Sequence, residues 1–146
     1  MKENKESKTI NRRWESQNKN RRFFDRMYVD VKVRLCDKEP VFGPGLMILL
    51  EEIGYTGSMK EACARMGMSY SKGWKIVNRA EEALGYELII RHHGGTKGGK
   101  CSVTDKGKSM MERYEKMEHE IRANAELLFL QQFPEFKKNK RNKDKK

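Results

Sequence analysis

Apolar and charged residues alternate strictly from Val29 to Leu35, with the apolar side chains on one face and the charged ones on the other. A period of two residues is typical of a strand that is buried on one side, so we predict a half-buried strand over this range. We expect Asp37 to Pro40 to turn the chain and Val41-Phe42 to pair back as a short second strand.

Helices follow, and each is marked by the residues that begin and end it. Gly43-Pro44-Gly45 interrupts the second strand before an apolar helix predicted from about Leu46 to Ile53. Ser58, with Glu61 three residues later, forms the capping box of a helix from about Met59 to Met66.

A three-residue turn then separates two helices. Gly67 can adopt the positive φ that ends the second helix, and Ser69 can cap a third helix that runs to about Leu84 and is closed by Gly85. Two helices joined in this way are typical of a helix-turn-helix, whose second helix enters the major groove of DNA. Such helices cross closely, and the small residue that this requires is Cys63, four positions before the turn glycine.

The third helix has an apolar side and a cationic side. Val77, Ala80 and Leu84 form its inward stripe. The outward stripe holds small hydroxyls and cations, which are the groups that base edges and phosphates require. Its members are Ser71, Lys72, Lys75 and Arg79. An ordinary solvated helix face would show the same charges, so the pattern alone leaves both interpretations open.

A second hairpin is predicted from Glu87 to Arg91 and from Cys101 to Thr104, around a long tip from His92 to Lys100. Four glycines and two lysines in this tip allow backbone and cations to lie close to a phosphodiester strand, as the wing of a winged helix does. A plain surface loop is the alternative, although it would not need the cations.

The same tip matches the start of a nucleotide-binding P-loop, because Gly94 to Lys100 reads G-x-x-x-x-G-K. However, Cys101 stands where Ser or Thr should hold magnesium. Residues 102–104 also look like a strand, where the motif requires a helix N-terminus. We therefore do not expect nucleotide hydrolysis.

Thr104 caps a final helix predicted from Asp105 to about Phe129. Apolar residues recur along it at alternating spacings of four and three, like a coiled-coil seam in which Asn124 would fix the register. About 25 residues of helix extend roughly 37 Å, longer than such a small body, which favours pairing with a second copy over packing on its own domain. The seam residues, our predicted dimer interface, are Met110, Tyr114, Met117, Ile121 and Leu128.

The chain has 146 residues and a net charge of +11, which allows one domain with tails and favours a polyanionic partner. The first 26 residues hold 9 basic and 4 acidic residues and the last 10 hold 7 and 1, whereas the remainder is balanced at 16 and 16. We divide the chain into a basic disordered arm (1–26), a winged helix-turn-helix domain (27–104), a C-terminal dimerisation helix (105–130) and a Lys-rich disordered tail (131–146).

Several classes of protein are disfavoured. No apolar run approaches the roughly 18 residues of a membrane span, and no signal peptide is recognisable. Cys36, Cys63 and Cys101 are odd in number, widely spaced and without a CxxC pair, so neither a disulfide framework nor a zinc site is supported. We expect a cytoplasmic protein with no membrane association, no metal and no cofactor.

Several motifs coincide with one family pattern. Ser69 to Asn78 reads Ser-Tyr-x-x-Gly-Trp-x-x-Val-Asn, Gly94 to Gly99 reads Gly-Gly-x-Lys-Gly-Gly, and Val103-Thr104 precedes Gly107. With Gly57-Ser58, Leu88 and Ile90-Arg91, the chain resembles the N-terminal DNA-binding domain of the ModE family of molybdate-responsive transcription regulators. It is more distantly similar to the winged helix of LysR-type regulators. The resemblance covers about Val29 to Ile121. Full-length ModE proteins continue into an oxyanion-binding module of β-rich repeats, which this chain lacks, so we expect no response to molybdate.

The resemblance implies a mainly α fold with a small β-wing, in which a winged helix-turn-helix precedes a long dimerisation helix. It implies a sequence-specific double-stranded DNA-binding transcription regulator, not an enzyme, that binds an inverted repeat as a homodimer. Trp74 is expected to pack under the recognition helix. By position, the resemblance implies DNA contacts from Ser69, Tyr70, Ser71, Lys72, Lys75, Thr96, Lys97 and Lys100. Arg79 of the outward stripe and Ser58 complete the candidate DNA-binding residues.

Three other functions stay open. The first is non-specific binding of DNA or RNA through the basic tails, with the body as a scaffold. The second is a metal or redox sensor that uses Cys36, Cys101, His92 and His93, although they do not form a cluster at ligand spacing. The third is an enzyme, which ranks last because no nucleophile has an adjacent base and no paired carboxylates stand in a glycine-bounded pocket.

Overall fold

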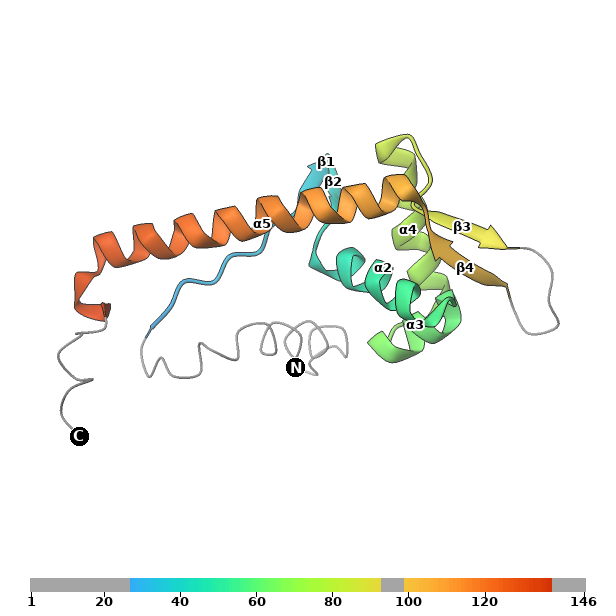
Figure 1. Cartoon of the computed structure of the whole chain (residues 1–146), viewed down its shortest axis with the longest axis horizontal. Helices are drawn as coiled ribbons and strands as arrows, with labels where there is room; N and C mark the ends of the chain where they lie inside the picture. Colours follow the sequence, from blue (N-terminus) through green and yellow to red (C-terminus); the bar gives the residue numbers. More distant parts are fainter. Residues whose placement is uncertain (1–26, 93–98, 138–146) are drawn as a thin grey trace.

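The computed structural model describes residues 27–92 and 99–137. Figure 1 shows a small helical body with a two-stranded hairpin at one end and one long helix that extends beyond it. The predicted fold class is confirmed: the chain is mainly α with a small β-wing, and a long C-terminal helix follows the winged helix-turn-helix. The predictions for the basic arm, the wing tip at 93–98 and the tail after residue 137 lie outside the described residues.

The first hairpin consists of β1 (Leu35–Asp37) and β2 (Glu39–Phe42), which are antiparallel. Lys38 alone makes the turn and has a φ of 58°, in the left-handed region that non-glycine residues seldom adopt. The turn is therefore tighter than the predicted one, and Val41-Phe42 forms part of β2 as expected.

The strand predicted from Val29 to Leu35 is wrong, because only Leu35 belongs to β1 and residues 27–34 are extended without a strand partner. Their burial still alternates, since odd-numbered residues from 29 to 35 are half-buried and even-numbered ones are exposed. The segment is joined to the long helix at two points, as the Tyr114 hydroxyl donates to the Val33 carbonyl at 2.8 Å and Arg122 lies 3.6 Å from the exposed Asp30. Val33 and Leu35, on the half-buried side, pack against the core, so the period of two arises from one-sided packing without a partner strand.

Three helices form the body around one core. Helix α2 (Pro44–Thr56) begins two residues earlier than predicted because Pro44 occupies its first turn, where a missing N–H costs nothing. Helix α3 (Met59–Met66) has the predicted bounds, and α4 (Tyr70–Leu84) begins after Ser69 and ends at Gly85 as expected. The largest fully buried side chains are Phe42, Leu49, Leu50, Ile53, Met59, Met66, Leu88 and Ile89, with Val77 and Cys63.

Helices α3 and α4 cross at a contact that only glycine permits. A Cβ atom added at Gly73 of α4 would lie 2.3 Å from the Cys63 sulfur of α3 and 3.2 Å from the Met59 sulfur. The Gly67 turn between them has a φ of 71°, as predicted. Cys63 therefore has the packing role expected from the sequence, and its partner is Gly73 on the next helix.

The second hairpin pairs β3 (Ile89–His92) with β4 (Lys100–Val103), and Arg91 lies opposite Cys101. Both strands are shifted by one or two residues from the predicted ranges. The Cys101 N–H donates to the Gly57 carbonyl at 2.9 Å, which ties the hairpin to the turn between α2 and α3. Because β4 follows the glycine-rich tip directly, the chain has a strand where a P-loop requires a helix.

Helix α5 (Asp105–Gln132) begins at the predicted cap, where the Thr104 hydroxyl accepts from the Gly107 N–H at 2.9 Å. It runs three residues further than predicted and is followed by a short 3-10 turn, η2 (Pro134–Phe136). Within the described residues, none of the helices is both long enough and apolar enough to cross a bilayer.

Candidate nucleic-acid interface

The exposed side of α4 is held in place by the cap of this helix. The Ser69 hydroxyl accepts from the Lys72 N–H at 3.2 Å and lies 3.4 Å from the Ser71 hydroxyl. The predicted outward stripe is exposed along its length, from Ser71 to Arg79. The cap fixes the start of α4, and burial of Gly73, Val77 and Ala80 on its other side leaves a row of hydroxyls and cations facing solvent.

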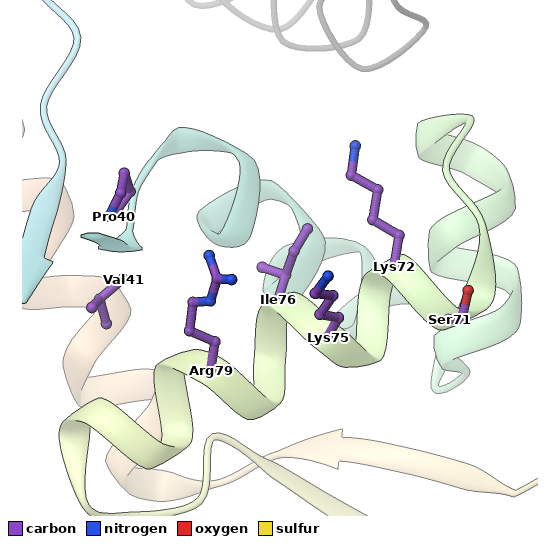
Figure 2. A pocket seen from close by; sticks show the side chains of 7 residues that line it. All are labelled: Pro40, Val41, Ser71, Lys72, Lys75, Ile76 and Arg79. Carbon is purple, nitrogen blue, oxygen red and sulfur yellow. The ribbon is translucent and has the colours of Figure 1, made fainter. Parts of the chain in front are cut away.

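Two hollows flank this row. The first is a shallow groove of about 540 Å³ between α4 and β2, lined by Pro40, Val41, Ser71, Lys72, Lys75, Ile76 and Arg79. In Figure 2, the longer of these α4 side chains project to one side of the helix, and Pro40 and Val41 lie beside them. The second hollow is lined by Ser71, Trp74, Lys75, Asn78, Arg79 and Glu82.

Three residues line both hollows: Ser71, Lys75 and Arg79. They are spaced by four residues, so they stand on one face of α4 and form the crest between the two hollows. We call these three residues the ridge. An exposed cationic crest on a helix, with a hollow on each side, has the shape and charge that suit a groove of DNA.

The far end of the ridge is paired with an acid. Nη1 of Arg79 lies 3.4 Å from Oε2 of Glu39 on β2, with 50% and 68% of the two side chains exposed. An ion pair as exposed as this contributes little to stability. No sequence pattern connects Glu39 with Arg79, which is 40 positions away in the chain.

The opposite flank of α4 is fastened to the wing by Arg91 of β3. Its guanidinium carbon lies 4.3 Å from the centre of the Trp74 ring, and Nη2 donates to Oδ1 of Asn78 at 2.8 Å. Trp74 is half-buried and lies edge-on to the exposed Tyr70 ring, with 6.2 Å between the ring centres. Trp74 thus lies on the wing side of α4, where it is partly packed against the core, as expected, and where its ring contacts the wing residue Arg91.

Glu81 completes this connection. One of its carboxylate oxygens accepts from the Leu88 N–H at 2.8 Å and from the Ile89 N–H at 3.5 Å, and the other lies 3.5 Å from Arg91. Helix α4 thus binds the start of β3 through its own side chain. Neither Glu81 nor the role of Arg91 was predicted, because no local pattern indicates that the two meet.

The structure places the other candidate DNA contacts as follows. Ser58 is half-buried, and its hydroxyl accepts from the Glu61 N–H at 3.2 Å, so it serves as a helix cap. Lys100 is exposed at the start of β4, opposite His92. Thr96 and Lys97 lie outside the described residues.

The predicted dimer residues divide into two groups along α5. Met110 and Tyr114 are buried in the core of their own chain, and the Tyr114 ring lies 5.0 Å from the Phe42 ring. Burial, with a smaller effect of the nearby Glu118 carboxylate, raises the pKa of Tyr114 to about 12. Met117 is half-buried, whereas Ile121 and Leu128 are 38% and 58% exposed. Only the distal part of the seam is therefore open to another molecule.

The cysteines do not meet at a metal site within the described ranges. All three are free thiols, and no group of three or more metal-ligating side chains occurs in residues 27–92 and 99–137. Cys63 and Cys101 are buried, and burial raises the pKa of each thiol. Both are thus less reactive than ordinary surface cysteines.

Comparison with known proteins agrees with this geometry. Residues 45–108 match the model of the bacterial regulatory helix-turn-helix proteins of the lysR family. The DNA-binding transcriptional dual regulator ModE of Escherichia coli (strain K12) is 26% identical over 90 residues, covering 61% of this chain and 34% of that protein. The molybdenum transport protein ModE of Azotobacter vinelandii is 29% identical over 80 residues, covering 55% of this chain and 30% of that protein.

Other matches extend this group. The molybdenum-pterin-binding protein MopB of Rhodobacter capsulatus is 31% identical over 72 residues, covering 49% of this chain and 27% of that protein. Among solved structures, ArgP from Mycobacterium tuberculosis matches with a TM-score of 0.38 and 18% identity over 54% of this chain and 29% of that chain, a likeness too weak to establish a shared fold. The chain spans about a third of the length of the curated relatives that it matches.

Proposed function

Because this chain carries a ModE- and LysR-like helix-turn-helix, we propose that it is a sequence-specific, double-stranded DNA-binding transcription regulator that acts as a homodimer on an inverted repeat. The single observation that carries this proposal is the ridge, an exposed row of hydroxyl and cations on the second helix of the motif. The wing is fastened to the same helix through Arg91 and Glu81.

The two parts of the interface have different tasks in this proposal. The exposed side of α4, from Ser69 and Tyr70 through Ser71, Lys72 and Lys75 to Arg79, enters the major groove, where side chains distinguish base pairs by their donors and acceptors. The wing, with Thr96, Lys97 and Lys100, lies on the neighbouring backbone. Phosphate contacts fix position and supply affinity, whereas base contacts supply sequence preference.

A homodimer requires a surface on each copy that its own chain leaves open. Met110 and Tyr114 are already covered, so we propose that the distal half of α5, with Ile121 and Leu128, makes the contact. A two-fold dimer places its recognition helices on half-sites that lie about 34 to 36 Å apart or a multiple of this distance. No response to molybdate is proposed, since the match covers about a third of the ModE relatives.

Selection from a random duplex library, followed by titration at several salt concentrations, tests the proposal. We expect a preferred inverted repeat whose affinity exceeds that of a random duplex by about 10³-fold or more at physiological salt. Equal affinities for both duplexes, lost when residues 1–26 and 138–146 are deleted, would instead establish non-specific binding through the basic tails.

Substitutions then separate the two tasks. Ser71→Ala is expected to change the selected sequence, whereas Lys97→Ala and Lys100→Ala should weaken binding to all duplexes alike and flatten the salt dependence. Lys116→Ala, which removes the same charge from an exposed position on α5, is the matched control and should leave binding almost unchanged. An identical loss for Ser71→Ala and Lys100→Ala on every duplex would contradict the division of tasks.

A further inference from the structure

Glu39 is placed unusually for a residue beside a DNA-binding surface. It lies on β2, across the groove from the ridge, and its carboxylate is 3.4 Å from the Arg79 guanidinium. Asp37 lies opposite Glu39 in the hairpin register, with Lys38 at the turn between them. Glu39 therefore places a negative charge beside Arg79, where a DNA-binding surface normally presents positive charge.

This pairing makes Arg79 a poor partner for phosphate. A phosphate oxygen that approached the guanidinium would also approach the Glu39 carboxylate, and two like charges at such separation repel. Guanine O6 and N7, in contrast, are neutral acceptors, and arginine binds them with two parallel hydrogen bonds. The guanidinium has five N–H donors in a rigid plane, more than one carboxylate can engage.

The groove also restricts how Arg79 can move. The apolar side chains of Pro40, Val41 and Ile76 line the groove beside it, and Figure 2 shows Arg79 projecting from α4 between Ile76 and the β2 residues. The Glu39 carboxylate and these apolar side chains together leave the Arg79 guanidinium fewer favourable orientations than an arginine on an open surface has. Fixed donors discriminate between bases because a wrong base cannot be accommodated by turning the side chain.

We propose that Glu39 is a specificity-determining positioning residue, which orients Arg79 to bind a guanine edge and disfavours its contact with phosphate. The inference rests on the proposed function, since it assumes that α4 enters the major groove. Arg79 lies eight positions after Ser71, and eight residues of helix rise about 12 Å. Residues three to four apart on a helix in the major groove reach successive bases, so the guanine lies about two to three base pairs from the base that Ser71 faces.

The test is selection from a random duplex library with the full-length wild-type chain and three variants. We expect the wild type to select a guanine at this position, with a preference over other bases of about 5- to 150-fold, the range typical of one bidentate contact. Arg79→Ala should lose this preference. Glu39→Gln should reduce it to under about threefold while raising the affinity for random-sequence duplex, because the carboxylate charge is gone.

Asp37→Asn is the matched control, since it removes the same charge from the same hairpin at the residue opposite Glu39. It should raise affinity for all duplexes and leave the guanine preference intact. If Glu39→Gln behaves as Asp37→Asn does, Glu39 acts through charge alone and the proposal is wrong. A wild-type chain that selects no sequence at all would instead overturn the proposed function itself.

Discussion

Replacing Gly73 by alanine probes the contact on which the geometry of the helix-turn-helix depends. The added Cβ would lie 2.3 Å from the Cys63 sulfur. Carbon atoms in good contact are separated by about 3.5 to 4.0 Å, so α3 and α4 would have to part by roughly 1.2 to 1.7 Å at this point. Cys63 is 1% exposed, and its sulfur, one bond from Cβ, has little space into which it can rotate.

The expected change combines two opposing terms. Overpacking of a core costs about 1 to 3 kcal/mol, whereas removing a glycine from a helix interior gains about 0.5 to 1 kcal/mol. Gly54 of α2 isolates the second term, because it lies inside a helix and a Cβ there has nothing within 4 Å. We therefore expect the free energy of unfolding of Gly73→Ala to be about 1 to 3 kcal/mol lower than that of Gly54→Ala. This difference measures the cost of overpacking against Cys63.

Urea denaturation, followed by circular dichroism, gives the free energy of unfolding of both variants. The two values can be compared if the dependence of the free energy on urea concentration is the same in both. A double-mutant cycle with Cys63→Ala adds a second check: the loss in the double variant should be smaller than the sum of the single losses, because the clashing sulfur is gone. If Gly73→Ala is as stable as Gly54→Ala, the two helices are not in the tight contact described, and the orientation of α4 does not depend on glycine.

Three further outcomes are expected. Glu81→Gln should lower the free energy of unfolding by about 1 to 3 kcal/mol and speed hydrogen exchange at the Leu88 and Ile89 amides, because a charged acceptor is lost; unchanged exchange would show that the wing is held elsewhere. Tyr114→Phe should cost about 1 kcal/mol in urea denaturation through its lost hydrogen bond. The pKa of Tyr114 is raised to about 12 in the folded protein, whereas an unfolded chain releases this proton near pH 10. The free energy of unfolding of the wild type should therefore fall between about pH 10 and 12. Tyr114→Phe should lack this pH-dependent contribution. Leu128→Glu should shift the chain toward monomer in sedimentation equilibrium, whereas Lys116→Glu should not; equal effects would place the dimer contact elsewhere on the chain.

The helix-turn-helix could be predicted from the sequence because its boundaries depend on local chemistry. Ser58 and Ser69 each accept a backbone N–H within their own first turn, and Gly67 and Gly85 each adopt positive φ at a helix end. These interactions span at most three or four residues, so the pattern that encodes them is contiguous. The bounds of α3 and the start and end of α4 were accordingly predicted correctly.

The segment from Val29 to Leu35 shows what such patterns leave undetermined. A period of two residues correctly indicates which side of an extended chain is covered, and the half-buried residues are the predicted ones. It carries no information about what the segment packs on or binds: Val33 and Leu35 pack against the core, and the Val33 carbonyl accepts from Tyr114 of α5, about 80 positions away along the chain. A strand needs a partner for its backbone groups, and alternation alone does not supply one.

The candidate site divides in the same way. The ridge residues were found because four-residue spacing on a helix is visible in sequence. Glu39 and Arg91 were missed because each meets α4 only through tertiary structure, Glu39 at Arg79 and Arg91 above Trp74. An isolated acid on a hairpin and an arginine in a strand show no period that would connect them to the helix.

The seam of α5 extends this reasoning to the proposed dimer. Apolar spacing of four and three indicates a stripe that needs covering, and the described part of the chain covers only the beginning of this stripe. Its first part, Met110 and Tyr114, completes the core of its own chain, whereas Ile121 and Leu128 remain exposed. Helix α5 first packs in its own domain and then extends beyond it. Because a continuous helix is stiff over such a length, it would hold the domain in a fixed position relative to a molecule bound at its distal end. The spacing of two recognition helices would then be determined by the distal contact. An apolar substitution at Leu128 that keeps the dimer, unlike Leu128→Glu, should therefore change the preferred half-site separation without changing the sequence selected within each half-site.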